Sequence, residues 1–356
     1  MRVGLIGLGG VGEVHLEAYN TLEGIEVIAG AEIDAERLEK ISNKFKFNPY
    51  SDYTEMLSSE DLDLICVLTP CSTHPEVVEY CASKGVHILC EKPLAVDMEG
   101  ANRIIAATEK NNIKFCYGST YRFLPAIMKA QEIILSGQLG EIQYLCEESL
   151  GGAGPESFEH MGYQHYPKGG IGGSGMGLVD HGIHLIDVFS WIMSSPITSV
   201  YGRGNISGEK PKTEFMHMIF ENGAMGHLVY NDCTYSTTLP GEGMFGWGGA
   251  WSLKGYTPPG EWQEHPGCIR IYGTKGALRI FHYPNKLYMS TEKGIEQVKL
   301  LDRPAPENFA MQMEEFISNI KNDTKITVTG QAGIDALKAL LATYKSFEEK
   351  GVVEIK

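Results

Sequence analysis

The sequence lacks any apolar stretch of the roughly 18–20 residues that a membrane-spanning helix requires. It also lacks the charged, apolar and cleavable segments of a signal peptide, because Met1 is followed almost at once by the apolar run Val3–Leu8. We therefore predict a chain that neither spans a membrane nor enters the secretory route, and we expect it in the cytoplasm.

Cysteine pairs at metal-binding spacing are missing as well. The chain has eight cysteines but no Cys-x-x-Cys motif, and Cys66, Cys90 and Cys116 lie inside apolar, strand-like segments. Cysteines in such segments are usually buried and reduced. The sequence thus predicts a fold that is stabilised by its core and not by disulfide bonds.

Positive charge is in short supply. Thirty Lys and Arg residues stand against 45 Asp and Glu residues, which gives a formal net charge of −15 at pH 7. A phosphate backbone or an anionic membrane surface would repel such a chain, since its basic residues are scattered and form no patch. The composition argues against nucleic acid and membranes as partners.

The first third of the 356 residues alternates short apolar runs with longer helical segments. The expected strands are Val3–Leu8, Glu26–Glu32, Leu62–Leu68, His87–Cys90 and Lys114–Gly118. The expected helices lie near Val11–Asn20, Ala35–Asn43, Pro75–Lys84 and Met98–Asn111. Strands that are apolar throughout are typical of a parallel sheet covered on both faces, so this part predicts a doubly wound α/β domain.

After an expected helix at Pro125–Ser136 the pattern changes to many strand-like runs. These are Ile142–Ser149, Val200–Ile206, Glu214–Phe220, Gly226–Tyr235, Cys268–Tyr272, Ala277–His282 and Lys286–Ser290, with turn signals at Asn222-Gly223 and Thr274-Lys275-Gly276. Helices are expected at Met176–Met193, Glu307–Lys321 and Gln331–Glu349. Turn signals between neighbouring runs predict hairpins, and hence an α+β domain with a large, open, mostly antiparallel sheet.

The expected division is residues 1–122 for the first domain and 123–356 for the second. A sheet with helices on one side leaves its other face free to pack on another subunit. We therefore expect a homodimer or homotetramer that forms through the second domain's sheet.

A glycine-rich turn follows the first expected strand and precedes a helix. Its residues are Gly7, Leu8, Gly9, Gly10, Val11 and Gly12, with Gly7, Gly9 and Gly12 in the G-x-G-x-x-G spacing. In that setting the first glycine permits a tight turn, the second lets the backbone approach a pyrophosphate, and the third lets helix and strand pack closely. The motif predicts a dinucleotide-binding Rossmann domain.

The next strand ends in Glu32-Ile33-Asp34, about twenty residues after the glycines. A carboxylate there accepts hydrogen bonds from the ribose hydroxyls of NAD and repels the 2′-phosphate of NADP. No arginine or lysine stands at the strand tip in the sequence, so NAD is expected over NADP.

Two further segments follow strands of the parallel sheet, at the edge where ligands bind in open α/β folds. The first contains Thr69, Pro70 and His74, and the second is Glu91-Lys92-Pro93. A lysine at this edge can lie near both a nicotinamide and a substrate oxygen, where its charge stabilises a developing alkoxide.

Glu91-Lys92-Pro93, preceded by the Thr69-Pro70…His74 segment, resembles the hallmark motif of the glucose–fructose oxidoreductase, inositol dehydrogenase and MocA family. Tyr121-Arg122-Phe123 is similar to that family's arginine-containing segment, and Gly170 through Asp187 is similar to its glycine-rich approach to a D-x-x-x-H helix. The resemblance extends over essentially the whole chain. It implies a Rossmann domain that binds NAD through the glycine turn, Glu32, Ile33, Thr69, Pro70, His74, Glu91, Lys92 and Pro93.

Asp180, His184 and Asp187 fall at i, i+4 and i+7, so a regular helix would put them on one face. An imidazole flanked by carboxylates can act as an acid or base near neutral pH. In inositol dehydrogenase-like members the resemblance implies that His184 takes the hydroxyl proton, Asp180 supports it and Lys92 polarises the oxygen. The base is either His184 or Lys92 in different members of the family.

Other polar and aromatic residues permit more than one interpretation. Tyr163, with His160 and His165, lies before the glycine run and is either a substrate ligand or part of an exposed loop; Tyr121 and Arg122 are further candidates for substrate binding. Asp180, His181 and His184 are metal-ligand types, but no further ligand motif accompanies them, so no metal is expected. The Trp-rich segment Gly241–Gly267 suits a sugar face or a subunit interface, and an interface or the rim of the active site is favoured over contact with sugar.

The resemblance implies an NAD-dependent dehydrogenase that oxidises a secondary hydroxyl of a cyclic polyol, either a sugar, a glycoside or an inositol, by hydride transfer to nicotinamide C4. One alternative is a glycosidase or lyase in which NAD oxidises the sugar transiently. A less favoured alternative is a non-catalytic NAD-binding regulator, which would be expected to have lost Lys92 or His184, and both are present.

Overall fold

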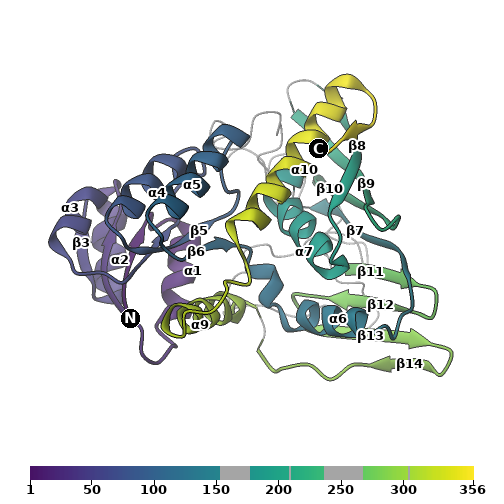
Figure 1. The fold of residues 1–356 in the computed structure, drawn as a ribbon, viewed down its shortest axis with the longest axis horizontal. Helices are drawn as coiled ribbons and strands as arrows, with labels where there is room; N and C mark the ends of the chain where they lie inside the picture. Colours follow the sequence, from purple (N-terminus) through teal and green to yellow (C-terminus); the bar gives the residue numbers. More distant parts are fainter. Residues whose placement is uncertain (153–176, 208–209, 236–267, 304) are drawn as a thin grey trace. The chain divides into compact units, whose positions relative to one another are not determined.

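The computed structural model describes residues 1–152, 177–207, 210–235, 268–303 and 305–356. The chain divides into two compact units (Figure 1). The first comprises Met1–Thr120 and Phe309–Ile334, and the second comprises Tyr121–Asn308 and Asp335–Lys356. The sequence predicted one domain boundary, after Arg122. In the structure the C-terminal segment Phe309–Ile334 also belongs to the first unit.

The sheet of the first unit has six parallel strands in the order β3-β2-β1-β4-β5-β6. Their bounds are β1 Arg2–Ile6, β2 Glu26–Ala31, β3 Asn48–Tyr50, β4 Leu64–Val67, β5 His87–Glu91 and β6 Phe115–Gly118. The order reverses direction at β1, which is the mark of a doubly wound sheet and confirms that prediction. The edge strand β3 was not predicted, because three residues around Pro49 show no hydrophobic pattern.

The helices of this unit connect the strands. They are α1 Gly10–Tyr19, α2 Ala35–Phe45, α3 Tyr53–Ser59, α4 His74–Ser83 and α5 Met98–Lys110. Asp34 and Asp97 begin α2 and α5 by accepting backbone hydrogen bonds from Arg37 and Gly100, which satisfies a free N–H in each first turn. The connection through α1 leads from β1 toward one edge of the sheet, and those through α4 and α5 lead from β4 toward the other edge. Since crossovers are right-handed, α1 and the pair α4 and α5 cover opposite faces of the sheet (Figure 1).

The C-terminal segment of the first unit contains most of α9, Glu307–Lys321, a helix whose bounds the sequence predicted. Phe309 packs edge-on against the His15 ring of α1, with ring centroids 4.8 Å apart. Gln312 donates a hydrogen bond of 3.0 Å to the carbonyl of Tyr117 in β6. Both partners lie in the first unit, so these contacts explain why α9 belongs to it.

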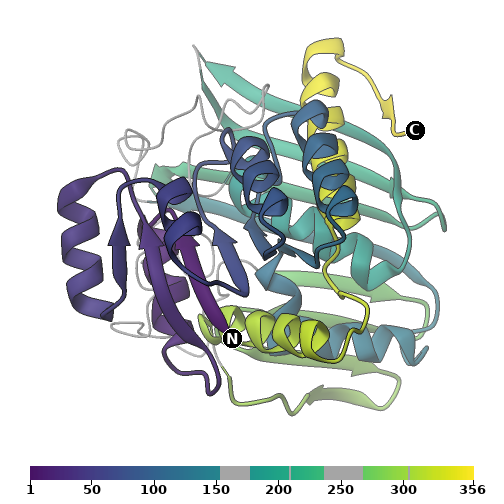
Figure 2. The same ribbon diagram turned by 60° about the vertical axis from the view of Figure 1, so that its left-hand side comes forward.

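The second unit is built on a nine-stranded sheet in the order β14-β13-β12-β11-β7-β10-β9-β8-β15 (Figure 2). The strands are β7 Ile142–Gly152, β8 Ile197–Ser207, β9 Lys210–Phe220, β10 Met225–Tyr235, β11 Cys268–Gly273, β12 Gly276–Phe281, β13 Lys286–Thr291, β14 Gly294–Gln297 and β15 Val353–Glu354. Among the described strands of this second sheet, only β7 and β10 pair in parallel. The β9–β10 and β11–β12 hairpins confirm the two turn signals.

Helices α6 Pro125–Leu135, α7 Ile183–Met193 and α10 Gly330–Glu349 lie over one face of this sheet (Figures 1 and 2). The expected continuous helix from Met176 is different in the structure. A π-helical turn, η4 Leu178–Gly182, precedes α7, and Met176 itself lies outside the described residues. Single π turns of this kind are frequent at functional sites.

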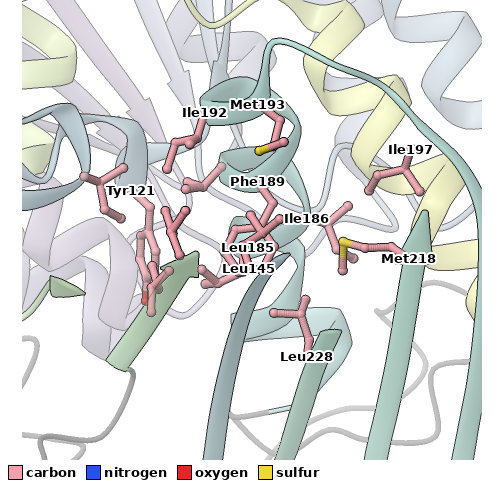
Figure 3. Packing of buried hydrophobic residues seen from close by; sticks show 14 of the residues in the cluster. Tyr121, Leu145, Leu185, Ile186, Phe189, Ile192, Met193, Ile197, Met218 and Leu228 are labelled. Atoms are coloured by element: carbon pink, nitrogen blue, oxygen red, sulfur yellow. The ribbon is translucent and has the colours of Figure 1, made fainter. Parts of the chain in front are cut away.

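The core of the second unit forms where α7 meets the sheet. Phe189 and Ile186 of α7 are fully buried, and Figure 3 shows them packed toward Leu145, Met218 and Leu228 of the strands. A fully buried aromatic or aliphatic side chain contributes roughly 1.5–3 kcal/mol through removal of its surface from water. Phe189 and Ile186 therefore hold α7, the helix that carries His184, against the sheet.

No helix among the described residues is both long and apolar enough to cross a membrane. The seven cysteines whose side chains are described are buried.

Candidate active site

The glycine turn between β1 and α1 is shaped by two close backbone approaches. Gly7 has φ +91°, and a Cβ there would lie 2.8 Å from the carbonyl of Leu68. A Cβ on Gly12 would lie 2.5 Å from the carbonyl oxygen of Gly7. Real Cβ atoms do not come so close, so both glycines are needed for α1 and the end of β4 to pack against this turn.

The middle of the same turn is open. A Cβ added to Gly9 or Gly10 would meet nothing within 4 Å, while Leu8 between the turn's glycines is buried. Gly9 is the N-cap of α1 and supplies no side-chain cap, so the first N–H groups of the helix have no side-chain acceptor at its cap. Free N–H groups at a helix N-terminus bind anions, and this cradle therefore fits the pyrophosphate of a dinucleotide.

Glu32 closes the turn from the side of β2. Its side chain is buried, and its carboxylate accepts hydrogen bonds from the backbone N–H of Leu8 at 2.9 Å and of Asp34 at 3.1 Å. The carboxylate therefore fixes the turn, in addition to the ribose contact implied by the resemblance. Ile33, predicted beside it, is 92% exposed.

No arginine or lysine was expected at this strand tip, and that expectation is wrong. The guanidinium of Arg37, in the first turn of α2, lies 3.6 Å from the carboxylate of Glu32 and 3.6 Å from that of Asp34. A residue five positions after Glu32 reaches back because α2 begins immediately at Ala35.

His74, predicted as a cofactor ligand, is fully buried in the structure. Its Nε2 lies 2.8 Å from the carbonyl oxygen of Thr69, and its Nδ1 lies 3.2 Å from that of Leu94. Burial lowers the pKa of His74 below its usual value, which favours a neutral ring. His74 thus joins the Thr69-Pro70 turn to the Glu91-Lys92-Pro93 turn, and the ring itself is not placed to contact a ligand.

Glu91 is likewise engaged inside the first unit. One carboxylate oxygen lies 3.0 Å from Nε2 of His15 on α1, and the other accepts a 3.0 Å hydrogen bond from the backbone N–H of Lys92. Nδ1 of His15 in turn lies 2.6 Å from the hydroxyl of Tyr19. The sequence analysis missed His15, although the His15–Tyr19 spacing on α1 was a signal that the two side chains share a helix face.

Lys92 is the next residue after Glu91, whose carboxylate is held in place by these contacts. Its side chain is half-buried, and the Lys92–Pro93 peptide is cis. The turns that contain Thr69 and Lys92 both follow strands of the sheet at the carboxyl edge, β4 and β5, which are neighbours. This edge and the glycine turn at the end of β1 form the ligand-binding edge of a doubly wound sheet.

In the second unit Arg122 has a different role from the substrate contact predicted for it. Its Nε donates a 2.7 Å hydrogen bond to Asp187, its Nη2 bonds to the second carboxylate oxygen, and both side chains are buried. The guanidinium also lies over the Trp191 ring, 5.3 Å from the centroid. The helical spacing suggested that Asp187 flanks His184, but the structure pairs Asp187 with Arg122, a residue far away in the sequence.

His184 is buried on α7, and its ring stacks on Tyr121 with centroids 4.0 Å apart and an angle of 4° between planes. Asp180 is buried in the π turn one helical turn earlier. The hydroxyl of Tyr121 lies 3.2 Å from Nδ1 of His181 and bonds to the hydroxyl of Tyr283. Burial raises the pKa of Tyr121 well above its usual value, so the phenol stays protonated.

Several predicted residues lie outside the described part of the chain. These are Tyr163, His160 and His165, the glycines 170, 172 and 173, and the Trp-rich segment Gly241–Gly267.

Two family models match the chain. A model for the oxidoreductase family's NAD-binding Rossmann fold matches residues 1–119, and one for the family's C-terminal alpha/beta domain matches residues 132–355. The chain is therefore an oxidoreductase with an NAD-binding Rossmann domain. It belongs to the glucose–fructose oxidoreductase, inositol dehydrogenase and MocA family, which confirms the resemblance seen in the Glu91-Lys92-Pro93 motif.

Relatives with similar sequences or structures agree with this membership. The chain is 24% identical to the myo-inositol 2-dehydrogenase of Thermotoga maritima over 100% of this chain and 98% of that one. A crystal structure of myo-inositol 2-dehydrogenase from Lactobacillus plantarum has a TM-score of 0.77 at 23% identity, covering 100% and 99% of the two chains. The WlbA dehydrogenase from Bordetella pertussis, solved with NADH and UDP-GlcNAcA, has a TM-score of 0.77 at 20% identity over 100% and 98%.

The buried Arg122–Asp187 pair gives a stability prediction. Asp187→Asn keeps the side-chain shape but leaves the buried guanidinium without its counter-charge, so we expect the free energy of unfolding to fall by about 3–5 kcal/mol. The measurement is urea-induced unfolding followed by circular dichroism.

The matched control is the exposed pair of Arg103 and Glu79, whose side chains are 49% and 38% exposed. Glu79→Gln removes the same charge from the same kind of bidentate pair and should cost less than about 1 kcal/mol. Equal losses in the two variants would contradict a structural role for the buried pair.

Proposed function

We propose that the chain is an NAD-dependent dehydrogenase that oxidises a secondary hydroxyl of a cyclic polyol, either a sugar, a glycoside or an inositol. The observation that carries this proposal is the first unit's binding edge, where an open backbone cradle at Gly9 and Gly10 shares the strand ends with the turn that holds Lys92. NAD, when bound, supplies the hydride acceptor at nicotinamide C4.

The first unit would hold the cofactor and the reacting oxygen. The cradle N–H groups would bind the pyrophosphate, and Glu32 the adenosine ribose. Lys92 would bind the substrate oxygen and stabilise its negative charge as the proton leaves. The Glu91 carboxylate, fixed by His15, keeps the backbone of Lys92 in place for this task.

The second unit would supply the proton acceptor. We propose that His184 takes the hydroxyl proton and that Asp180 stabilises the imidazolium that results. Stacking on Tyr121 fixes the plane of the His184 ring, and a fixed ring can receive a proton without first reorienting.

The polyol class rests on the relatives. Those similar over their whole length are named inositol 2-dehydrogenases, and others are named for sugar substrates such as D-apiose.

The preference for NAD over NADP follows from Glu32. Its carboxylate repels a 2′-phosphate, but Arg37 at 3.6 Å offsets part of that repulsion. We propose that NAD is preferred and that the preference is modest because this arginine lies beside the carboxylate.

We also propose that a second copy of the chain covers the open face of the nine-stranded sheet, giving a homodimer or homotetramer. Along β11, Ile269 and Ile271 point into the core while Arg270 and Tyr272 face the other side. Tyr272 is 45% exposed, and Ile295 of β14, in the same row across the sheet, is 76% exposed. Apolar and aromatic exposure together is typical of subunit interfaces.

The dehydrogenase proposal is tested by mixing the purified chain with NAD and a panel of inositols, aldoses and glucosides, and following the absorbance of NADH. One class of polyol should give NADH, and Lys92→Met and His184→Asn should each lower kcat by about 10²–10⁴-fold. Lys84→Met, an exposed lysine at the end of α4, and His217→Asn, a half-buried histidine of β9, are the controls and should retain the rate.

Release of an aglycone without net NADH would instead support the glycosidase or lyase alternative. Binding of NAD with no turnover of any compound would support the regulator. Either outcome contradicts the dehydrogenase proposal.

The cofactor proposal is tested with Glu32→Gln, which keeps a hydrogen-bond acceptor for Leu8 but removes the charge. The ratio of kcat/KM for NAD to that for NADP should fall about tenfold or more, and Arg37→Ala in the same background should restore part of it by removing the cation. Glu36→Gln, an exposed neighbour on α2, is the control. An unchanged ratio in Glu32→Gln would show that this carboxylate does not set the preference.

A further inference from the structure

Three metal-ligand side chains meet in the second unit. Glu147 comes from β7, His181 from the π turn and His282 from the residue after β12. One ligand atom from each lies within 4.8 Å of the other two, and all three residues are buried. They lie more than thirty positions apart in sequence, so the spacing arguments that predict metal motifs could not bring them together.

The distances within this cluster suit one small cation. Nε2 of His181 lies 2.9 Å from one oxygen of Glu147, and Nδ1 of His282 lies 3.8 Å from the other. Nitrogen and oxygen ligands bound at zinc distances in a tetrahedral arrangement lie about 3.4 Å from one another. The three ligand atoms lie within 4.8 Å of one another, so side-chain shifts on the order of 1 Å would bring them onto one ion.

A second layer of hydroxyl groups holds the ligands. The hydroxyl of Tyr230 donates a 2.7 Å hydrogen bond to Glu147. The hydroxyls of Tyr121 and Tyr283 lie 3.2 Å and 3.3 Å from Nδ1 of His181, the nitrogen that faces away from Glu147. Metal-binding histidines and carboxylates are usually oriented by such outer hydrogen bonds.

The surroundings of the Glu147 carboxyl group also fit a cation. Its side chain is fully buried. Among the described residues no hydrogen-bond donor reaches the Oε1 atom of Glu147. Buried carboxylates are normally paired or bound to a metal, and the buried guanidinium of Arg122 in the same unit is bonded to Asp187.

We propose that Glu147, His181 and His282 bind one divalent transition-metal ion of the zinc class. Two imidazoles and one carboxylate are a ligand set that such ions favour, and three protein ligands leave a coordination position open for an oxygen ligand. The sequence analysis grouped His181 with Asp180 and His184 and expected no metal. The site does not depend on the proposed dehydrogenase activity, because it requires neither NAD nor a polyol.

The test uses the untagged full-length chain, dialysed against a chelator and then given Zn²⁺ or Co²⁺ alone. After desalting, the bound metal is counted by mass spectrometry, and the visible spectrum of the Co²⁺ sample is recorded. We expect one ion per chain, and a cobalt absorption far stronger than that of the hydrated ion, because a site with few ligands breaks the symmetry of the hydrated complex.

Glu147→Gln and His282→Asn should each weaken binding of Zn²⁺ at least about tenfold. His227→Asn is the matched control: His227 lies 2.9 Å from Glu148, the next residue along β7, and opposite His217 of β9, but these three side chains do not bring their ligand atoms together as the cluster does. The control should bind one ion like the unmodified chain.

Failure to bind either ion, or binding that Glu147→Gln and His282→Asn leave unchanged, would overturn the proposal. If a buried substitution prevents folding, the cobalt spectrum of the unmodified chain decides alone, and a spectrum like that of the hydrated ion overturns the proposal. Activity with NAD and a polyol is measured on the same samples, so a failure of the dehydrogenase proposal is seen separately.

Discussion

The contact between α1 and the turn before it is the constraint on which the cofactor half of the molecule depends. With no side chain on Gly12, the helix packs directly against the carbonyl of Gly7. That approach puts the N–H groups at the start of α1 beside the open part of the turn, where a dinucleotide phosphate can bind. The same helix carries His15, so the placement of α1 also places the partner of Glu91.

One helix thus organises two chemical functions. The binding of a pyrophosphate depends on the first turn of α1, and the orientation of the Lys92 turn depends on a histidine one turn further along. Glu32 and His74 connect the remaining loops, the first by holding Leu8 and the second by bridging Thr69 and Leu94. In the second unit the corresponding rigidity comes from burial, because α7 holds His184 through Phe189 and Ile186 in the core (Figure 3).

The parts of the fold that the sequence predicted are those with local signals. Apolar runs gave the strands of the doubly wound sheet, and Asn222-Gly223 gave a hairpin, because turn chemistry and hydrophobic period act over a few residues. The short β3 and α3 were missed because three to seven residues carry little periodicity. The π turn was missed because a π turn and an α-helix have the same apolar pattern over so short a length.

The interactions that sequence reasoning could not find are pairings between distant elements. Arg122 with Asp187, His15 with Glu91, and Glu147 with His181 join residues 34 to 76 positions apart. Each changes the expected role of a residue: Asp187 pairs with Arg122, Glu91 holds a turn, and His181 bonds to Glu147. The spacing of residues along one helix does not show which side chain of another element they contact. The sequence therefore predicts the residue types of a motif, but not the distant residues that hold them in place.

The most direct test of the account is the affinity for NADH, measured by the fluorescence of the bound nicotinamide, in Gly12→Ala and Gly202→Ala. An added Cβ would lie 2.5 Å from its nearest neighbour at both positions, but that neighbour is the backbone of Gly7 for Gly12 and the side chain of Phe347, in the second unit, for Gly202. If the approach of α1 to Gly7 creates the cofactor cradle, Gly12→Ala weakens NADH binding at least about tenfold, a change of about 1.4 kcal/mol, and Gly202→Ala leaves it unchanged. Unaltered NADH binding in a folded Gly12→Ala variant would contradict the account.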